Sequence, residues 1–229
     1  MGLERRGGDH FRCAGHNSNE DDVLVQRKAF EIPKSLVWMA YQDVRRNRGA
    51  PGCDGQTLTD FGRQRDQNLY RIWNRLCSGS YFPPSVREKR IPKDNGKERI
   101  LGIPTVSDRV AQGAVKRYVE AVIDPIFHAD SYGYRPGRSA HDALRQCSIR
   151  CRRKNWVLEV DISAFFDHVG HDLIIKALEH HQMTNWVILY CRRWLQASMR
   201  SEAGLLQERG RGTPQGGVIT PATTEQTLG

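Results

Sequence analysis

The chain has 229 residues, of which 38% are hydrophobic and 27% charged, so it can bury the core of one sizeable domain or of two small domains that share a core. No apolar run approaches the roughly 18 residues of a membrane-spanning helix, and residues 1–8 precede no apolar stretch of the kind that a secretory signal needs. The net charge of +9 favours a polyanionic partner such as nucleic acid.

The first elements are predicted from helical spacing and from breaker residues. Residues 1–30 are rich in glycine and polar side chains, and they are expected to form a disordered leader. A helix is predicted to begin near Leu36 and to end in the Gly- and Pro-containing cluster at 47–52. A second helix is predicted over residues 58–77.

The remaining elements mix short strands with helices. Two basic strands are expected at 86–91 and 98–103, joined by a hairpin-like turn. Residues 156–162 give the clearest strand pattern of the chain. Further helices are predicted at about 107–123, 140–153, 171–181 and 186–197, with glycine-containing loops at 132–138 and 209–217. This mixture predicts an α+β fold.

The six cysteines form no Cys-x-x-Cys pair. Cys147 and Cys151 stand four residues apart and can share a helix face, but no second ligand pair follows at zinc spacing. His10, Cys13 and His16 lie in the polar leader without a partner cluster. Reduced thiols in a cytoplasmic protein explain this pattern best.

A carboxylate, Asp161, stands at the end of the strand predicted over 156–162, and two aromatic residues and Asp167 follow it. Mg²⁺ prefers hard oxygen ligands of this kind and leaves other positions for phosphates and water. In nucleotidyl transfer, two such ions activate the attacking hydroxyl and stabilise the leaving pyrophosphate. Taken alone, the segment also fits an aspartate that ends a strand and another that caps a helix.

Three more segments carry residues suited to nucleic acid. The hairpin at 86–99 holds six cations against three carboxylates, which suits a triphosphate or a phosphodiester backbone. Residues 132–139 interleave tyrosines with arginines, as in proteins that stack on bases and pair with phosphates. The glycines of 210–217 allow backbone to approach a ligand closely. Singly, each segment also fits a solvated hairpin or a tight structural loop.

Together and in this order, the segments resemble group II intron-encoded reverse transcriptases, which are RNA-directed DNA polymerases joined to an RNA maturase. The resemblance runs from about Leu36 to Pro221 through five blocks, at 47–55, 90–104, 131–141, 161–167 and 212–221. It implies a right-hand polymerase fold with fingers at 31–130, an incomplete palm at 131–221 and an unrelated tail at 222–229. It also implies an RNA template or intron RNA, a DNA primer and deoxynucleotide triphosphates as partners, and no membrane.

The resemblance assigns the catalytic role to Asp161. Its carboxylate and the Ile162 carbonyl would hold magnesium in a two-metal site. Phe166 would lie under the sugar of the incoming deoxynucleotide and exclude a 2′-hydroxyl.

The resemblance also implies residues for the substrates. Lys93 and Arg99 would hold the triphosphate, and Gln215 would line the nucleotide pocket. Arg135 and Arg138 would contact the template.

The chain departs from the family pattern after the last block. In the family, a Tyr-Ala-Asp-Asp hairpin follows and supplies further metal-binding carboxylate, whereas here no Asp-Asp pair occurs after residue 22. Since one carboxylate cannot hold two metal ions against a triphosphate, we expect a truncated enzyme with negligible polymerase activity by itself. The strand at 156–162 would lack its usual neighbours and leave apolar surface exposed.

Two other functions fit parts of the sequence. A non-catalytic remnant of maturase type would bind RNA through its basic residues without chemistry. A metal-dependent nuclease would use Asp161 and Asp167, but this function explains one of the five blocks.

Overall fold

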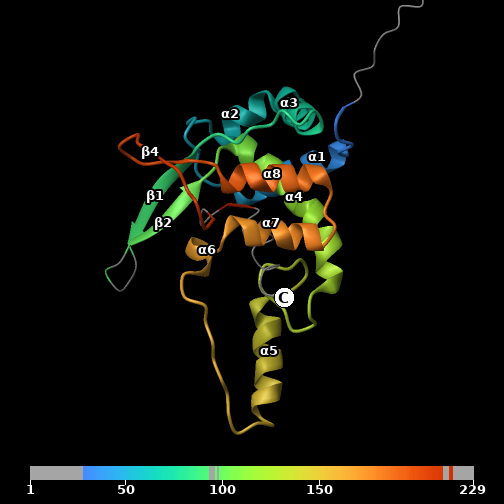
Figure 1. The fold of residues 1–229 in the computed structure, drawn as a ribbon, viewed down its shortest axis with the longest axis vertical. Coiled ribbons are helices and arrows are strands. Elements are labelled where there is room, and N and C mark those ends of the chain that lie inside the picture. Colours follow the sequence, from blue (N-terminus) through green and yellow to red (C-terminus); the bar gives the residue numbers. More distant parts are fainter. Residues whose placement is uncertain (1–27, 93–95, 97, 214–216, 219–229) are drawn as a thin grey trace, which may run out of the picture.

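The computed structural model describes residues 28–92, 96, 98–213 and 217–218. Most of the predicted leader, the tail at 222–229, Lys93 and Gln215 therefore lie outside the described residues. The described helices and strands are α1 Lys34–Asn47, α2 Leu58–Arg63, α3 Arg65–Cys77, β1 Val86–Pro92, β2 Glu98–Ile103, α4 Val106–Ile123, the short 3-10 helix η1 Asp124–Ile126, α5 Ala140–Cys151, α6 Phe165–His168, α7 His171–His180, α8 Asn185–Leu195, β3 Met199–Arg200 and β4 Leu206–Gln207 (Figure 1).

Helix α4 lies at the centre of the helical body, and α1 packs along it (Figure 1). Its sequence is apolar on several faces, so Val110, Ala111 and Val115 have no exposed area. Gly113 brings the two helices close together, because a Cβ at this position would stand 3.0 Å from the Cβ of Ala40. The helix begins at Thr105, whose side chain accepts a hydrogen bond from the backbone N–H of Asp108.

The helix predicted over 58–77 is divided in two. Gln64 leaves helical geometry, with φ −121° and ψ 35°, and separates α2 from α3. Gly62, a weak helix former, precedes the break. Thr57 and Asp60 cap α2 reciprocally, so this short helix has a fixed start of its own.

A small sheet flanks the helices in the order β2-β1-β3-β4. The predicted basic hairpin is confirmed, since β1 pairs antiparallel with β2 and Arg90 stands opposite Ile100. Strand β3 adds to the other edge of β1 in parallel, and β4 pairs antiparallel with β3. The sequence did not predict β3 and β4, because two residues are too few to show alternation.

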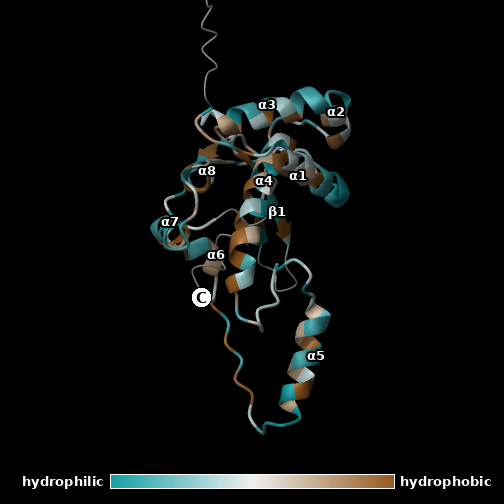
Figure 2. Ribbon diagram, turned by 90° about the vertical axis from the view of Figure 1, so that its right-hand side faces the viewer, coloured by the Kyte–Doolittle hydropathy of each residue, from teal (hydrophilic) through white to brown (hydrophobic). Residues whose placement is uncertain are grey.

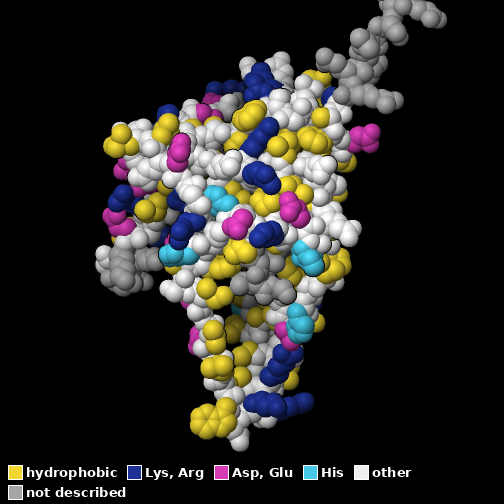
Figure 3. Space-filling view, viewed as in Figure 1, with side chains coloured by type: hydrophobic (Ala, Val, Ile, Leu, Met, Phe, Trp, Pro, Cys, Tyr) yellow, Lys and Arg dark blue, Asp and Glu magenta, His cyan; other side chains and the backbone are white. Residues whose placement is uncertain are grey.

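The strand predicted over 156–162 is wrong: these residues return from α5 as chain without regular structure. A strand needs a neighbour for its backbone hydrogen bonds, and among the described residues none lies beside it. Trp156, Leu158 and Val160 are 91%, 87% and 77% exposed, and α5 buries none of its residues. Residues 140–164, called the arm below, therefore project from the body, and the expected exposed apolar surface is confirmed (Figures 2 and 3).

One hydrophobic cluster extends from Ile32 to Leu195 and joins elements from before and after the arm. Tyr190 of α8 donates its hydroxyl to the carbonyl of Leu76 at the end of α3, over 2.7 Å. Arg193 donates to the carbonyls of Gly79 and Tyr81, which fixes the segment between α3 and β1 against α8. None of the helices within the described ranges combines the length and the apolarity needed to cross a membrane.

Candidate functional site

Helix α6 and the start of the block 212–221, called the Gly-rich block below, are held together by backbone hydrogen bonds. The N–H of Thr213 donates to the Phe166 carbonyl over 2.7 Å, and the N–H of Gly212 donates to the Val169 carbonyl over 2.8 Å. The carbonyl of Gly212 lies 2.8 Å from Nε2 of His171, a contact that needs the proton on that nitrogen. Two blocks that stand more than 40 residues apart in the sequence therefore meet.

Glycine is required at position 212 for two reasons. Its φ of +73° lies in the left-handed region, which strains other residues. A Cβ there would also lie 2.5 Å from the carbonyl oxygen of Asp167. The sequence analysis expected these glycines to let the backbone approach a ligand. In the structure, Gly212 lets the backbone approach α6 of the same chain.

Phe166 is partly exposed and stands edge-on to Phe165, with 5.7 Å between the ring centroids. Ala164 starts α6 in the left-handed region, at φ 50°, which turns the chain sharply out of the arm. Phe165 packs against the hydrophobic cluster and anchors the helix. The backbone carbonyl of Phe166 faces the Gly-rich block, because it accepts the N–H of Thr213.

Asp161 and Ile162 lie in the arm and not at a strand end. Both are exposed, and Ile162 retains 51% of its accessible area. The described residues gather no group of three or more His, Cys, Asp or Glu side chains that could hold a metal ion. A carboxylate and a carbonyl oxygen are ligands that Mg²⁺ accepts, but these residues alone do not complete a two-metal site.

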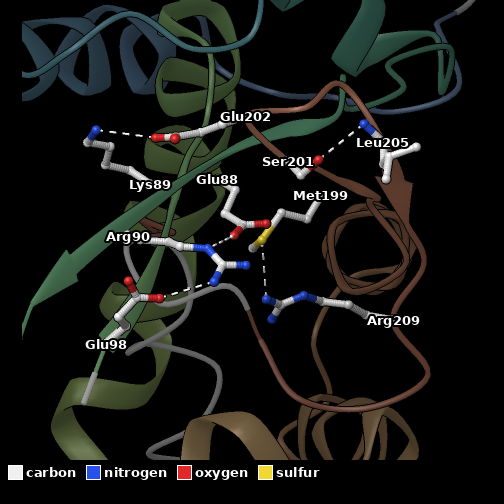
Figure 4. Close-up of polar contacts among 9 residues, drawn as sticks. All are labelled: Glu88, Lys89, Arg90, Glu98, Met199, Ser201, Glu202, Leu205 and Arg209. Carbon is white, nitrogen blue, oxygen red and sulfur yellow. Dashed lines mark hydrogen bonds and ion pairs between the residues drawn. The ribbon is translucent and has the colours of Figure 1, made fainter. Parts of the chain in front are cut away.

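The basic hairpin carries its own counter-charges (Figure 4). Arg90 is hydrogen-bonded to the carboxylates of Glu88 and Glu98, and these contacts raise its pKa. Lys89 pairs with Glu202, at 3.3 Å, in the turn that joins β3 to β4. Arg99 is exposed on β2 opposite Ile91.

Arg209 is a partly buried cation in the segment after β4. It donates a hydrogen bond to the sulfur of Met199 over 3.6 Å (Figure 4). Burial lowers the pKa of Arg209, while the charges of Asp167 and Glu88 act against that shift. Arg209 therefore lies within electrostatic range of the carboxylates of Glu88 and Asp167, and the sequence analysis did not single it out.

Arg135 is turned inward, with 7% of its side chain exposed. Its guanidinium donates to Asp124 over 2.8 Å, and this contact lowers the pKa of that carboxyl. It also donates to the carbonyls of His128 and Ser131. Template contact by Arg135 stays a prediction, and its geometry is that of a residue that shapes the loop.

The same loop exposes aromatic and cationic side chains. Tyr134 is 67% exposed, and the guanidinium of Arg138 lies 5.5 Å from the ring centroid of Tyr132. The loop is joined to the arm by a two-bond ion pair between Arg150 and Asp130, with both distances 2.8 Å. Template contact by Arg138 is a prediction that suits this exposed position.

Block 47–55 is used for packing. Arg109 of α4 donates to the carbonyls of Arg48 and Ala50. A Cβ at Gly52 would stand 2.6 Å from the backbone of Thr105, so only glycine fits there. This block therefore fixes the loop after α1 to the start of α4.

Two polar residues of α4 were missed by the sequence analysis. Asp108 is fully buried, and Gln112, one turn later, donates to it over 2.9 Å. Gln112 also accepts a hydrogen bond from the backbone N–H of Val218 in the Gly-rich block. The available signal was a polar pair at i, i+4 on the apolar face of a helix.

The five described cysteines are free, including Cys147 and Cys151, whose sulfurs lie 3.7 Å apart on α5. Burial raises the pKa of Cys191 to about 12. Its thiol is therefore protonated at neutral pH, which keeps it unreactive.

The family model for "Reverse transcriptase (RNA-dependent DNA polymerase)" matches residues 91–229, more than half of the chain. The chain belongs to the reverse transcriptase family. The protein YkfC of Escherichia coli K12 is 36% identical to this chain over 176 residues, which cover 75% of the chain and 46% of YkfC. The group II intron-encoded protein LtrA of Lactococcus lactis subsp. cremoris is 32% identical over 208 residues, which cover 89% of the chain and 34% of LtrA.

These relatives confirm the resemblance to group II intron-encoded reverse transcriptases. This chain spans less than half the length of the curated relatives YkfC and LtrA. A solved structure titled "Partial Cas6-RT-Cas1--Cas2 complex" superposes with a TM-score of 0.56 at 23% identity, covering 85% of this chain and 32% of that one. This likeness concerns the fold, and it confirms the expected α+β fold of a polymerase fingers and palm fragment.

Proposed function

We propose that this chain supplies the fingers and part of the palm of an RNA-directed DNA polymerase of the group II intron type. The observation that carries the proposal is the hydrogen bond from Thr213 to Phe166, at 2.7 Å. It joins the block with the proposed sugar-facing aromatic to the block that contains Gln215. An RNA template or intron RNA, a DNA primer and deoxynucleotide triphosphates are the proposed partners.

The residues of the site divide the work. Asp161, with the Ile162 carbonyl, is the proposed first ligand of magnesium, which when bound would supply Lewis-acid activation of the primer hydroxyl. Phe166 would exclude the 2′-hydroxyl of a ribonucleotide by steric contact. Arg99, with Lys93, would offset the charge of the triphosphate.

The chain by itself is proposed to have negligible polymerase activity. The described residues gather no group of three or more side chains that could hold a metal ion, and two metal ions need more oxygen ligands than one carboxylate and one carbonyl. A reducing cytoplasmic compartment is also proposed, because the described thiols are unpaired.

The alternative is a binding module that holds RNA without chemistry. The exposed Tyr134 and Arg138 favour it, because such a loop stacks on bases and contacts phosphates without a metal site. The net charge of +9 adds the electrostatic attraction that non-specific RNA binding requires.

The deciding experiment combines primer extension on an RNA template, with Mg²⁺ and deoxynucleotides, with RNA binding across a salt series. We expect salt-sensitive binding of template and primer, binding of deoxynucleotides that Phe166→Ala makes less selective against ribonucleotides, and no extension by the isolated chain. Primer extension that Asp161→Ala abolishes would overturn the proposed inactivity and would support the assignment as a polymerase. A chain that binds RNA but neither class of nucleotide would overturn the polymerase site in favour of the binding module.

A further inference from the structure

The carboxylate of Asp108 lies at the centre of a buried network. Asp108 has no exposed area and accepts hydrogen bonds from the hydroxyl of Tyr81 and from Nε1 of Trp194, both at 2.8 Å. Its third donor is Nε2 of Gln112, at 2.9 Å. The network therefore connects α4 with α8 and with the segment between α3 and β1.

Gln112 extends this network to the Gly-rich block. Its Oε1 accepts the backbone N–H of Val218 over 2.9 Å, while its Nε2 donates to Asp108. Gln112 is 4% exposed. Of the common side chains with this reach, an amide presents one donor and one acceptor in a fixed arrangement, so it suits a position between a carboxylate and a backbone N–H.

The Gly-rich block is thus held at two points by different elements. Gly212 and Thr213 are bonded to α6, as described above. Val218 is bonded to α4 through Gln112. Gln215, the proposed nucleotide-pocket residue, lies between these two attachments in the sequence.

We propose that Gln112 is a positioning residue for nucleotide binding, because it bonds the backbone of Val218 in the Gly-rich block to the Asp108 network. The inference rests on the proposed function, because it assigns the block to the nucleotide pocket. Gln112 itself is remote from substrate in this assignment and acts through Val218. Loss of its amide therefore weakens the binding of the incoming deoxynucleotide more than the binding of the RNA template.

The test compares two conservative variants of one network. Gln112→Met keeps the length of the side chain and removes the amide hydrogen bonds to Asp108 and Val218. Tyr81→Phe removes another donor to Asp108 and leaves the bond to Val218 in place. Urea unfolding of both variants shows whether their stability losses are comparable.

The first readout is hydrogen exchange at the Val218 amide in the ligand-free full chain. We expect Gln112→Met to accelerate it by roughly tenfold, the equivalent of one lost hydrogen bond, and Tyr81→Phe to leave it unchanged. Unchanged exchange in Gln112→Met, or equal acceleration in Tyr81→Phe, would overturn the positioning role.

The second readout is the affinity for a deoxynucleotide in the presence of template and primer. We expect Gln112→Met to lose affinity by several-fold more than Tyr81→Phe, with RNA binding equal in both. Equal losses in the two variants would overturn the inference. Absence of nucleotide binding in the unaltered chain would instead overturn the proposed function, and the exchange experiment decides separately whether Gln112 positions the block.

Discussion

The carbonyl oxygen of Asp167 stands 2.5 Å from the point that a Cβ on Gly212 would occupy. This approach is what allows the backbone of the Gly-rich block to bond to α6. Any side chain at position 212 would therefore disturb the proposed site. Gly204 is a suitable comparison, because it has a similar φ of +83° but no atom within 4 Å of the point that a Cβ would occupy.

Gly204→Ala is expected to lower the free energy of unfolding by about 1–2 kcal/mol, the cost of left-handed geometry. Gly212→Ala has the same strain and an additional clash with backbone, so we expect a larger loss or detachment of the block from α6. Urea unfolding measures the first effect, and hydrogen exchange at Thr213 measures the second. Equal behaviour of the two variants would contradict the close contact.

Asp108 is expected to make stability depend on pH. Burial raises its pKa to about 6 from an ordinary 3.8, so the folded state holds the proton more tightly than the unfolded state. Its stabilising contribution is full below pH 3.8 and is lost as the pH rises through about 6, by about 1.4 kcal/mol for each pKa unit. Urea unfolding between pH 4 and 7 should therefore show a flatter pH dependence for Asp108→Asn than for the unaltered chain. Parallel curves would show that the carboxyl does not titrate in this range.

Substitution of Arg135 is expected to affect mainly stability, and substitution of Arg138 is expected to affect mainly RNA binding. Arg135→Ala leaves the Asp124 carboxylate and three backbone carbonyls without their donor, and it should cost roughly 2–3 kcal/mol in urea unfolding. Arg138→Ala should change stability by less than about 0.5 kcal/mol but weaken RNA binding and reduce its salt slope by about 0.7. Arg63→Ala, which removes an exposed charge from α2, is the matched control. An unchanged salt slope in Arg138→Ala would remove this residue from the template contacts.

The apolar residues of the arm are expected to promote association without stabilising the fold. Leu158→Ser and Val160→Ser, at 87% and 77% exposure, should change the free energy of unfolding by less than about 0.5 kcal/mol. They should lower light scattering at high protein concentration, because they reduce exposed apolar area. Val187→Ser, at a fully buried position, is the contrasting control and should destabilise the chain strongly. A large stability loss in the arm variants would mean that this segment is packed in solution.

Elements with local causes could be predicted from the sequence. Helix α4 follows from its own apolar periodicity and the cap at Thr105, and the β1–β2 hairpin pairs neighbouring strands across a short turn. The segment at 156–162 has an equally clear pattern, but a strand depends on a neighbour, and the described residues provide none. The local pattern of apolar residues was therefore not sufficient to predict a strand.

The site was predicted less completely than the fold. The sequence brought attention to Phe166 and to the Gly-rich block, and the structure joins them. It could not reveal the partners of Asp108, because Tyr81 and Trp194 are 27 and 86 residues away. Nor could it show that Arg135 turns inward, since side-chain direction in a loop is decided by carbonyls that no motif encodes.

The shared core on both sides of the arm has a consequence for limited proteolysis. The hydrophobic cluster takes Leu76 and Val110 from before the arm and Leu178 and Tyr190 from after it, while α5 contributes no buried residue. A protease that cleaves the exposed chain between α5 and α6 would break only the covalent connection and leave the shared hydrophobic cluster intact. The two fragments would then migrate as one particle under native conditions and separate in denaturant.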